Sequence, residues 1–121
     1  MTTNSPHWKA LTEPAATRGT HTSSRNPPIC NVESAAYPQG LCAEASAIAA
    51  MVSAGERELA VVLTVCEGDM LSTCCGGCRQ KIREFATAAT VIHAAGPEGV
   101  RRSYSIEELL PDSFGPENLS H

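Results

Sequence analysis

The chain has 121 residues, a formal net charge of −4 and a hydrophobic fraction of 42%, which fits one modest domain. Its basic residues form no run and no segment approaches the roughly 20 apolar residues of a membrane span, which argues against duplex nucleic-acid binding and membrane insertion. The N-terminus shows no charged-then-apolar signal sequence. We therefore expect a cytoplasmic protein, in which the six cysteines stay reduced and indicate metal binding or catalysis before disulfides.

Residues 1–29 are rich in Thr, Ser, Pro, Asn and Ala and lack a sustained apolar period, so we predict coil, with at most one weak turn over residues 8–13. Pro27 and Pro28 close the segment and favour extended backbone before them. The dense apolar segments all lie later, so the core is expected in residues 30–121. So small a core has a high surface-to-volume ratio, and association with further copies of the chain would help to stabilise it.

The middle of the chain predicts a helix and then a strand. A short strand or loop over residues 29–40 leads into residues 41–56, which are rich in alanine, carry apolar residues at helical spacing and have Gly55 placed to end the helix. Residues 57–69 hold a nearly unbroken run of leucine and β-branched residues. Such a run is typical of a strand buried on both faces, with helices covering both sides of the sheet.

The last third predicts a second helix, two strands and a final short helix. The helix covers residues 78–86, and the strands cover residues 89–96 and 99–105 on either side of a Gly-Pro turn. The short helix covers residues 105–110 and has Ser105 as its cap. This order of elements indicates a layered α/β domain.

Three cysteines stand at the starts of the two longer helices. Cys75 and Cys78 are three positions apart, so both thiols can point the same way off the first turn, and Cys42 opens the earlier helix. A helix N-terminus favours the thiolate, which is the form that zinc binds. C-x-x-C alone is a weak signal, because redox pairs and zinc knuckles share it. Three protein ligands would leave the fourth zinc position open, as in catalytic sites.

Glu44 follows Cys42 by two positions. A carboxylate that is close to a ligand, without being needed as one, is well placed to take a proton from a metal-bound water, whose pKa zinc brings to about 7. The pattern C-x-E followed by C-x-x-C is a variant of the zinc deaminase signature, which allows three cysteines in place of one His and two Cys.

Residues 30–56, 74–86 and 108–119 resemble the small homotetrameric cytidine deaminases, through "CNVESAAYPQGLCAEASAIAAMVSAGE", "CCGGCRQKIREFA" and "ELLPDSFGPENL". The resemblance implies a three-layer α/β/α sandwich with a mixed central sheet. It also implies one zinc ion per chain and a homotetramer that acts on a small nucleoside.

The resemblance also assigns roles to single residues. It makes Glu44 the proton shuttle and the three cysteines the zinc ligands. It places the backbone of Ala43 against the pyrimidine amide. Asn31 and Glu33 match family positions that bind the ribose 3′-hydroxyl. Tyr37 and Phe114 match family positions that lie near the active site of a neighbouring subunit.

The implied reaction is hydrolytic deamination of cytidine and deoxycytidine to uridine and deoxyuridine, with release of ammonia, in pyrimidine salvage. In it a zinc-bound hydroxide attacks C4 while Glu44 moves protons. Two alternatives stay open: a deaminase for a related aminopyrimidine nucleoside of the blasticidin S type, and a non-catalytic zinc-binding relative that has lost its N-terminal part. A redox C-x-x-C protein is less favoured, because it leaves Cys42 and Glu44 unexplained.

The sequence departs from the family pattern in three places. Family members begin with a helix and two strands, and residues 1–29 show no pattern for them, so we expect an atypical, disordered leader ahead of the deaminase domain in residues 30–121. Either this leader forms substitute structure, or the N-terminal helix and first strands are missing or altered. Cys74 stands where the family usually has proline, so it adds a thiol beside a ligand. Ala45 stands where many relatives have an arginine that offsets the charge of the thiolates, and Arg79 is a candidate partial substitute.

Overall fold

The computed structural model describes residues 8–14 and 29–119. Its strands are β1 (Trp8–Pro14), β2 (Ile29–Cys30), β3 (Leu59–Cys66), β4 (Ala86–Gly96) and β5 (Gly99–Tyr104). Its helices are α1 (Ala43–Ser53), α2 (Gly76–Phe85) and α3 (Ile106–Leu109), with short 3₁₀ turns η2 (Tyr37–Gln39) and η3 (Pro116–Leu119). No helix among these residues combines the length and apolar character of a membrane span.

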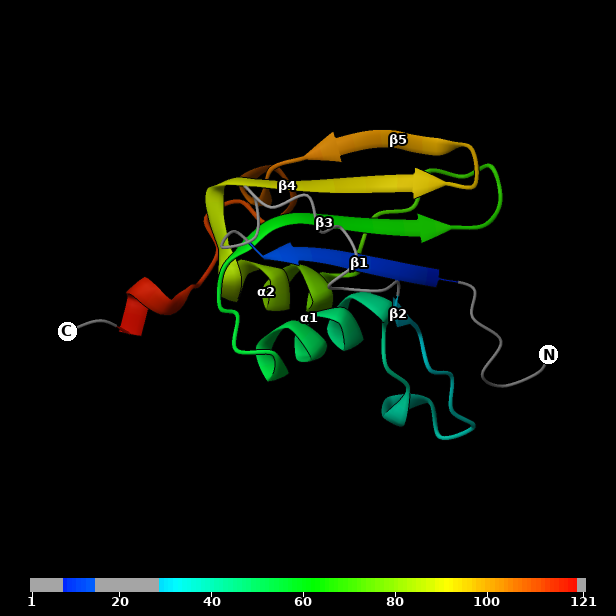
Figure 1. Cartoon of the computed structure of the whole chain (residues 1–121), viewed down its shortest axis with the longest axis horizontal. Coiled ribbons are helices and arrows are strands. Elements are labelled where there is room, and N and C mark those ends of the chain that lie inside the picture. Colours follow the sequence, from blue (N-terminus) through cyan, green and yellow to red (C-terminus); the bar gives the residue numbers. More distant parts are fainter. Residues whose placement is uncertain (1–7, 15–28, 120–121) are drawn as a thin grey trace.

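The strands form one five-stranded sheet in the order β2-β1-β3-β4-β5 (Figure 1). β3 and β4 are parallel and α2 lies in the connection between them, whereas the other neighbouring pairs are antiparallel. The predicted α/β class and the mixed central sheet are therefore confirmed.

Local sequence signals explain where the helices begin and end. α1 ends before Gly55, whose φ of 92° is left-handed and whose N–H donates to the carbonyl of Val52 at 3.0 Å. α3 begins with a capping box, in which the Ser105 hydroxyl accepts from the Glu108 N–H at 3.2 Å and the Glu108 carboxylate accepts from the Ser105 N–H at 3.0 Å. The helices predicted from spacing and caps are thus confirmed, with ends that differ by a few residues.

The prediction of coil over residues 8–13 is wrong. Trp8–Pro14 forms β1, which lies between β2 and β3 and pairs with β3 along its length, for example Leu11 with Leu63. The segment has little local pattern, and the unpaired edge of β3 supplies the hydrogen-bond partners that make it a strand. The other residues of the predicted leader, 1–7 and 15–28, lie outside the described residues, and the division of the chain after residue 29 stays a prediction.

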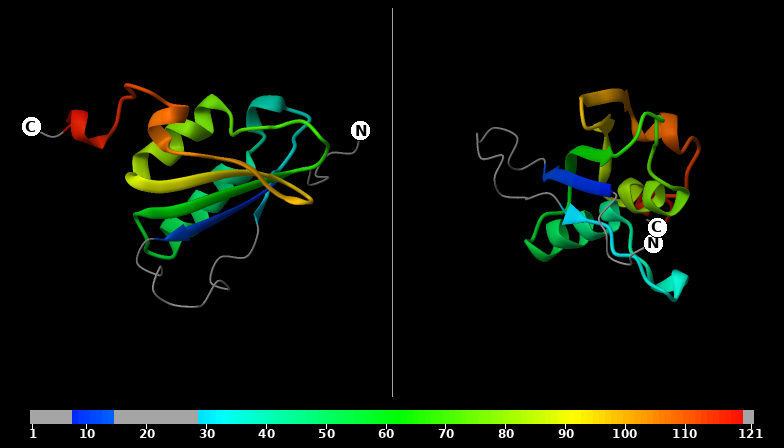
Figure 2. Two further views of the ribbon diagram at one scale, coloured as in Figure 1. Left: turned by 90° about the horizontal axis from the view of Figure 1, so that it is seen from above. Right: turned by 90° about the vertical axis from the view of Figure 1, so that its right-hand side faces the viewer.

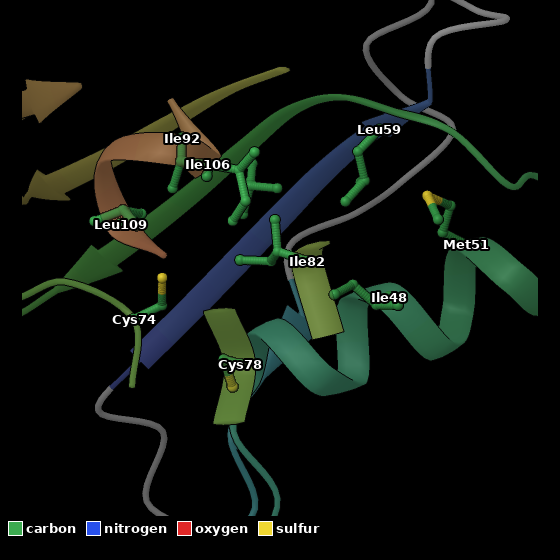
Figure 3. Close-up of a cluster of buried hydrophobic side chains, with 10 residues drawn as sticks. Ile48, Met51, Leu59, Cys74, Cys78, Ile82, Ile92, Ile106 and Leu109 are labelled. Atoms are coloured by element: carbon green, nitrogen blue, oxygen red, sulfur yellow. The ribbon is translucent and has the colours of Figure 1, made fainter. Parts of the chain in front are cut away.

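The core lies between the sheet and the helices. Val62 of β3 and Ile92 of β4 are paired neighbours that point into one buried cluster with side chains of all three α-helices (Figure 3). The helices α2 and α3 lie on the same side of the sheet (Figure 2). On the opposite face, alternate β3 residues (Val61, Leu63 and Val65) are half-buried. The described residues thus supply one of the two helical layers of the predicted sandwich.

Candidate metal centre and cavity

The starts of α1 and α2 face one point of the structure. Cys42 is the N-cap residue of α1 and Cys75 is the N-cap residue of α2, both with extended backbone. Cys78 lies in the first turn of α2. Because the first N–H groups of a helix have no partner within the helix, they can donate to a thiolate at either place.

The three sulfur atoms form a compact cluster. Those of Cys42, Cys75 and Cys78 all lie within 4.8 Å of one another, and the Cys42 and Cys75 sulfurs are 3.9 Å apart. Tetrahedral zinc with zinc–sulfur bonds of about 2.3 Å holds its sulfurs about 3.8 Å apart. The donor set therefore fits zinc in its chemistry, and the Cys42–Cys75 separation matches the spacing that zinc requires. Cys78 is buried while the other two cysteines are exposed, so the cluster is open on one side.

The surroundings of the three thiols differ. The backbone N–H of Cys78 donates to the Cys75 sulfur and lowers the pKa of the Cys75 thiol. Burial raises the pKa of both Cys42 and Cys78. A divalent cation between them would favour the thiolate form of all three, as is usual for thiol ligands of zinc.

Glu44 lies in the first turn of α1 and is only 3% exposed. Burial raises the pKa of its carboxyl, and hydrogen bonds from the Cys78 thiol and from its own backbone oppose that rise. A carboxyl whose pKa is raised toward neutrality can both accept and release a proton during a reaction.

A cavity of about 750 Å³ opens beside the thiols. Its lining includes most of the predicted site residues, namely Asn31, Glu33, Tyr37, Cys42, Ala43, Glu44 and Cys75. Cys78 is not part of this lining and is buried in the first turn of α2. Phe114 is not part of it either, and its side chain is 58% exposed.

A small β-bridge brings the two parts of the lining together. Val32 and Leu41 exchange two backbone hydrogen bonds of 2.8 Å, which closes the loop between them and places Asn31 and Glu33 near Cys42. Val32, Leu41 and Thr73 also line the cavity, and none of them is among the site residues predicted from the sequence. Val32 and Leu41 are ordinary apolar residues that carry no signal of a site in the sequence. Thr73 comes directly before Cys74 and Cys75, and this position could have marked it as a site residue.

The chain is similar in sequence to known cytidine deaminases. No model of a known protein family matches the chain. The chain is 33% identical over 92 residues to a cytidine deaminase of Sporosarcina psychrophila, which covers 76% of the chain and 68% of that protein. It is 36% identical over 85 residues to a cytidine deaminase of Mycoplasma genitalium, which covers 69% of the chain and 65% of that protein. The chain belongs to the cytidine deaminase family.

The structure agrees with this membership. A cytidine deaminase crystal structure from Burkholderia pseudomallei superposes with a TM-score of 0.72 at 28% identity, over 88% of this chain and 80% of that one. The aligned sequence segments span about two thirds of the length of the curated relatives. The chain is thus an enzyme of the cytidine deaminase type with an α/β fold.

Cys74, predicted from the sequence to stand at an expected proline position, lies in the core. It is 4% exposed and belongs to the buried cluster shown in Figure 3. Burial raises the pKa of its thiol to about 11, with a further contribution from the Glu44 carboxylate, so the thiol stays protonated at neutral pH. Cys74 therefore behaves as a small core residue, and the metal-ligand cluster of the described residues does not include it.

Arg79, the candidate substitute for the family's charge-compensating arginine, is hydrogen-bonded elsewhere. Its guanidinium donates to the carbonyls of Cys74 and Leu109, both at 2.9 Å, and to the Thr73 hydroxyl at 2.7 Å. None of these three acceptors is a sulfur of the ligand cluster.

Proposed function

We propose that this protein catalyses the hydrolytic deamination of cytidine and deoxycytidine to uridine and deoxyuridine, with release of ammonia. The observation that carries the proposal is the cluster of three cysteine sulfurs within 4.8 Å of one another, beside a buried glutamate and at the edge of a cavity of about 750 Å³. The relatives named above are cytidine deaminases, which does not favour the blasticidin S alternative.

Cys42, Cys75 and Cys78 would hold one zinc ion per chain as thiolates. When bound, zinc lowers the pKa of a coordinated water to about 7 and so supplies a nucleophile at neutral pH. Cys42 and Cys75 line the cavity, so the ion that the three cysteines would hold, and the activated water that it would supply, would be within reach of a substrate in that cavity.

Glu44 would move the protons. Its carboxylate would accept a proton from the attacking water and deliver it to N3 of the pyrimidine. It would then carry the second proton of that water, from the hydroxyl added at C4, to the leaving amino group, which departs as ammonia. The burial that raises the pKa of this carboxyl supports the role, because a raised pKa makes the carboxylate a better proton acceptor than an ordinary glutamate.

The loop before α1 would bind the sugar. Asn31 and Glu33 line the cavity, and an amide and a carboxylate there can hydrogen-bond the ribose 3′-hydroxyl, while the backbone of Ala43 contacts the base amide.

Two aromatic residues point to association. Tyr37 and Phe114 are exposed in the single chain, at 84% and 58%. We propose that they complete the site of a neighbouring subunit in a homotetramer. A role in pyrimidine salvage and a cytoplasmic location stay predictions.

The decisive experiment is turnover of cytidine by the zinc-loaded protein, followed by the ultraviolet change on forming uridine. Glu44→Gln removes the proton carrier at nearly constant volume, so kcat should fall by roughly 10²–10⁴-fold while zinc content stays at about one per chain. A folded parent protein that holds zinc but turns over neither cytidine nor deoxycytidine would contradict the proposal and favour the non-catalytic relative.

A further inference from the structure

The Arg79 side chain makes three hydrogen bonds that the proposed chemistry does not use. Nε donates to the Cys74 carbonyl and Nη1 to the Leu109 carbonyl, each at 2.9 Å, while Nη2 donates to the Thr73 hydroxyl at 2.7 Å. All three bonds are partly buried, so water competes for them less than at the surface.

These bonds reach a segment with no regular structure of its own. Residues 71–75, which lead into α2, are neither helix nor strand, so contacts from elsewhere must fix their position. Within this segment Thr73 lines the cavity, Cys74 packs in the core, and Cys75 is both a ligand candidate and part of the cavity lining. Arg79 contacts the two residues immediately before Cys75, and its own backbone N–H donates to the Cys75 carbonyl at 2.9 Å.

The hydrogen bond from Arg79 to the Leu109 carbonyl ties this segment to the buried core. Leu109 ends α3, is 6% exposed and belongs to the buried cluster that also contains Cys74 and Cys78. A guanidinium is a planar fork of fixed donors, so three acceptors from two separate segments determine where its plane lies. Arg79 thus connects the loop before Cys75 to the end of α3.

We propose that Arg79 is a positioning residue that holds Cys75 in place for metal binding and Thr73 in place on the cavity wall. The inference rests on the proposed metal site and deepens it. Groups that orient metal ligands are typically worth about 10–100-fold in metal affinity when they are removed. This role differs from offsetting the charge of the thiolates, because it depends on the geometry of the fork and not on the positive charge alone.

Metal affinity tests the proposal without reference to turnover. Co²⁺ would be titrated into metal-free, reduced protein, its thiolate charge-transfer absorption followed, and Zn²⁺ then used to displace it. Arg79→Met keeps most of the aliphatic stem and should weaken Co²⁺ and Zn²⁺ binding by about 10–100-fold. Arg79→Lys keeps the charge but loses the planar fork, so it should lose most of the same affinity.

Arg83, one turn further along α2, provides the matched control. Its guanidinium donates to the Ser113 hydroxyl at 2.8 Å and pairs with the Glu117 carboxylate, so it also ties α2 to the C-terminal segment without contacting residues 71–75. Arg83→Met should leave metal affinity within about threefold of the parent protein. Thr73→Val removes one acceptor while Arg79 stays intact, and should weaken metal binding by less than Arg79→Met does. If Arg79→Met does not fold, the metal affinity of Thr73→Val still tests the positioning role.

The outcomes separate this proposal from the one on which it rests. A parent protein without thiolate-to-cobalt absorption would contradict the metal site itself. A parent protein that binds Co²⁺ normally, with Arg79→Met or Arg79→Lys binding equally well, would overturn the positioning role. Equal loss in Arg79→Met and Arg83→Met would also overturn it, because the effect would then come from general loosening of α2.

Discussion

The cavity has two walls of different construction. The thiol wall consists of Cys42, Glu44 and Cys75, which lie at or within one turn of two helix starts and are supported by the core behind them. The loop wall consists of Asn31, Glu33 and Tyr37, which precede α1 on a segment closed by one β-bridge.

The two walls differ in their most and least exposed residues. Glu44 of the thiol wall is 3% exposed and Tyr37 of the loop wall is 84% exposed. The two cysteines of the thiol wall are exposed, while the asparagine and the glutamate of the loop wall are half-buried. Groups that bind a metal and move protons need fixed positions, and helix starts supply them, while a surface loop suits recognition of a variable part of the substrate. We therefore expect changes in the thiol wall to remove metal or lower kcat, and changes in the loop wall to raise KM.

The largest effect is expected from Cys75→Ser, in the thiol wall. The change removes one of three thiolates, so zinc content after dialysis should fall from about one per chain to less than about 0.1, and turnover should reach background. Elemental analysis and the uridine assay would measure both. Cys30→Ser changes an exposed cysteine outside the cluster and should alter neither quantity. Full zinc content in Cys75→Ser would contradict the assignment of Cys75 as a ligand.

Glu33→Gln tests the loop wall. Loss of a hydrogen bond to a charged group should raise KM for cytidine by roughly 10–100-fold, with kcat and zinc content nearly unchanged. The matched comparison uses 3′-deoxycytidine, which lacks the hydroxyl that Glu33 is proposed to bind. The parent protein and the variant should treat that substrate alike. An equal rise in KM with both substrates would place Glu33 elsewhere in recognition.

Cys74→Ala asks whether the thiol next to the metal cluster belongs to the site or to the core. Cys74 is 4% exposed, so the loss of its sulfur should lower the free energy of unfolding by about 1–2 kcal/mol, seen as an earlier urea midpoint. Zinc content should not change. Cys66→Ala, at a half-buried position at the end of β3, should cost less. A loss of zinc without a loss of stability would show that Cys74 serves the metal instead.

The smallest effect is expected away from both walls, at the turn between β4 and β5. The Arg101 guanidinium donates to Glu98 at 2.6 Å and lowers the pKa of that carboxyl below its ordinary value of 4.5. Since the folded pKa is the lower one, the pair stabilises the fold above pH 4.5 and loses this contribution as pH falls through the folded pKa. Parent and Glu98→Gln melting temperatures should differ slightly at pH 7 and converge at low pH. A difference that stays constant as the pH is lowered from 7 to the most acidic pH at which the protein still folds would argue against this linkage.

Much of the fold could be predicted because its signals are local. The alanine-rich stretch before Gly55 and the Ser105 cap predict α1 and α3 from short-range chemistry, and the β-branched run predicts β3. β1 could not be predicted in this way. Its residues become a strand because they pair with β3, a contact across roughly 50 positions of sequence that no local pattern encodes.

The same distinction between local signals and long-range contacts applies to the candidate site. The sequence by itself determined which side chains could carry the chemistry, because C-x-E and C-x-x-C place thiols and a carboxylate on the first turns of helices. The tertiary structure decided what depends on long-range packing: the 4.8 Å limit on the sulfur separations, the burial of Glu44 and the inward position of Cys74. The tertiary structure also decided which groups Arg79 donates to. A long side chain with five donors forms hydrogen bonds with the acceptors that the fold places within its reach.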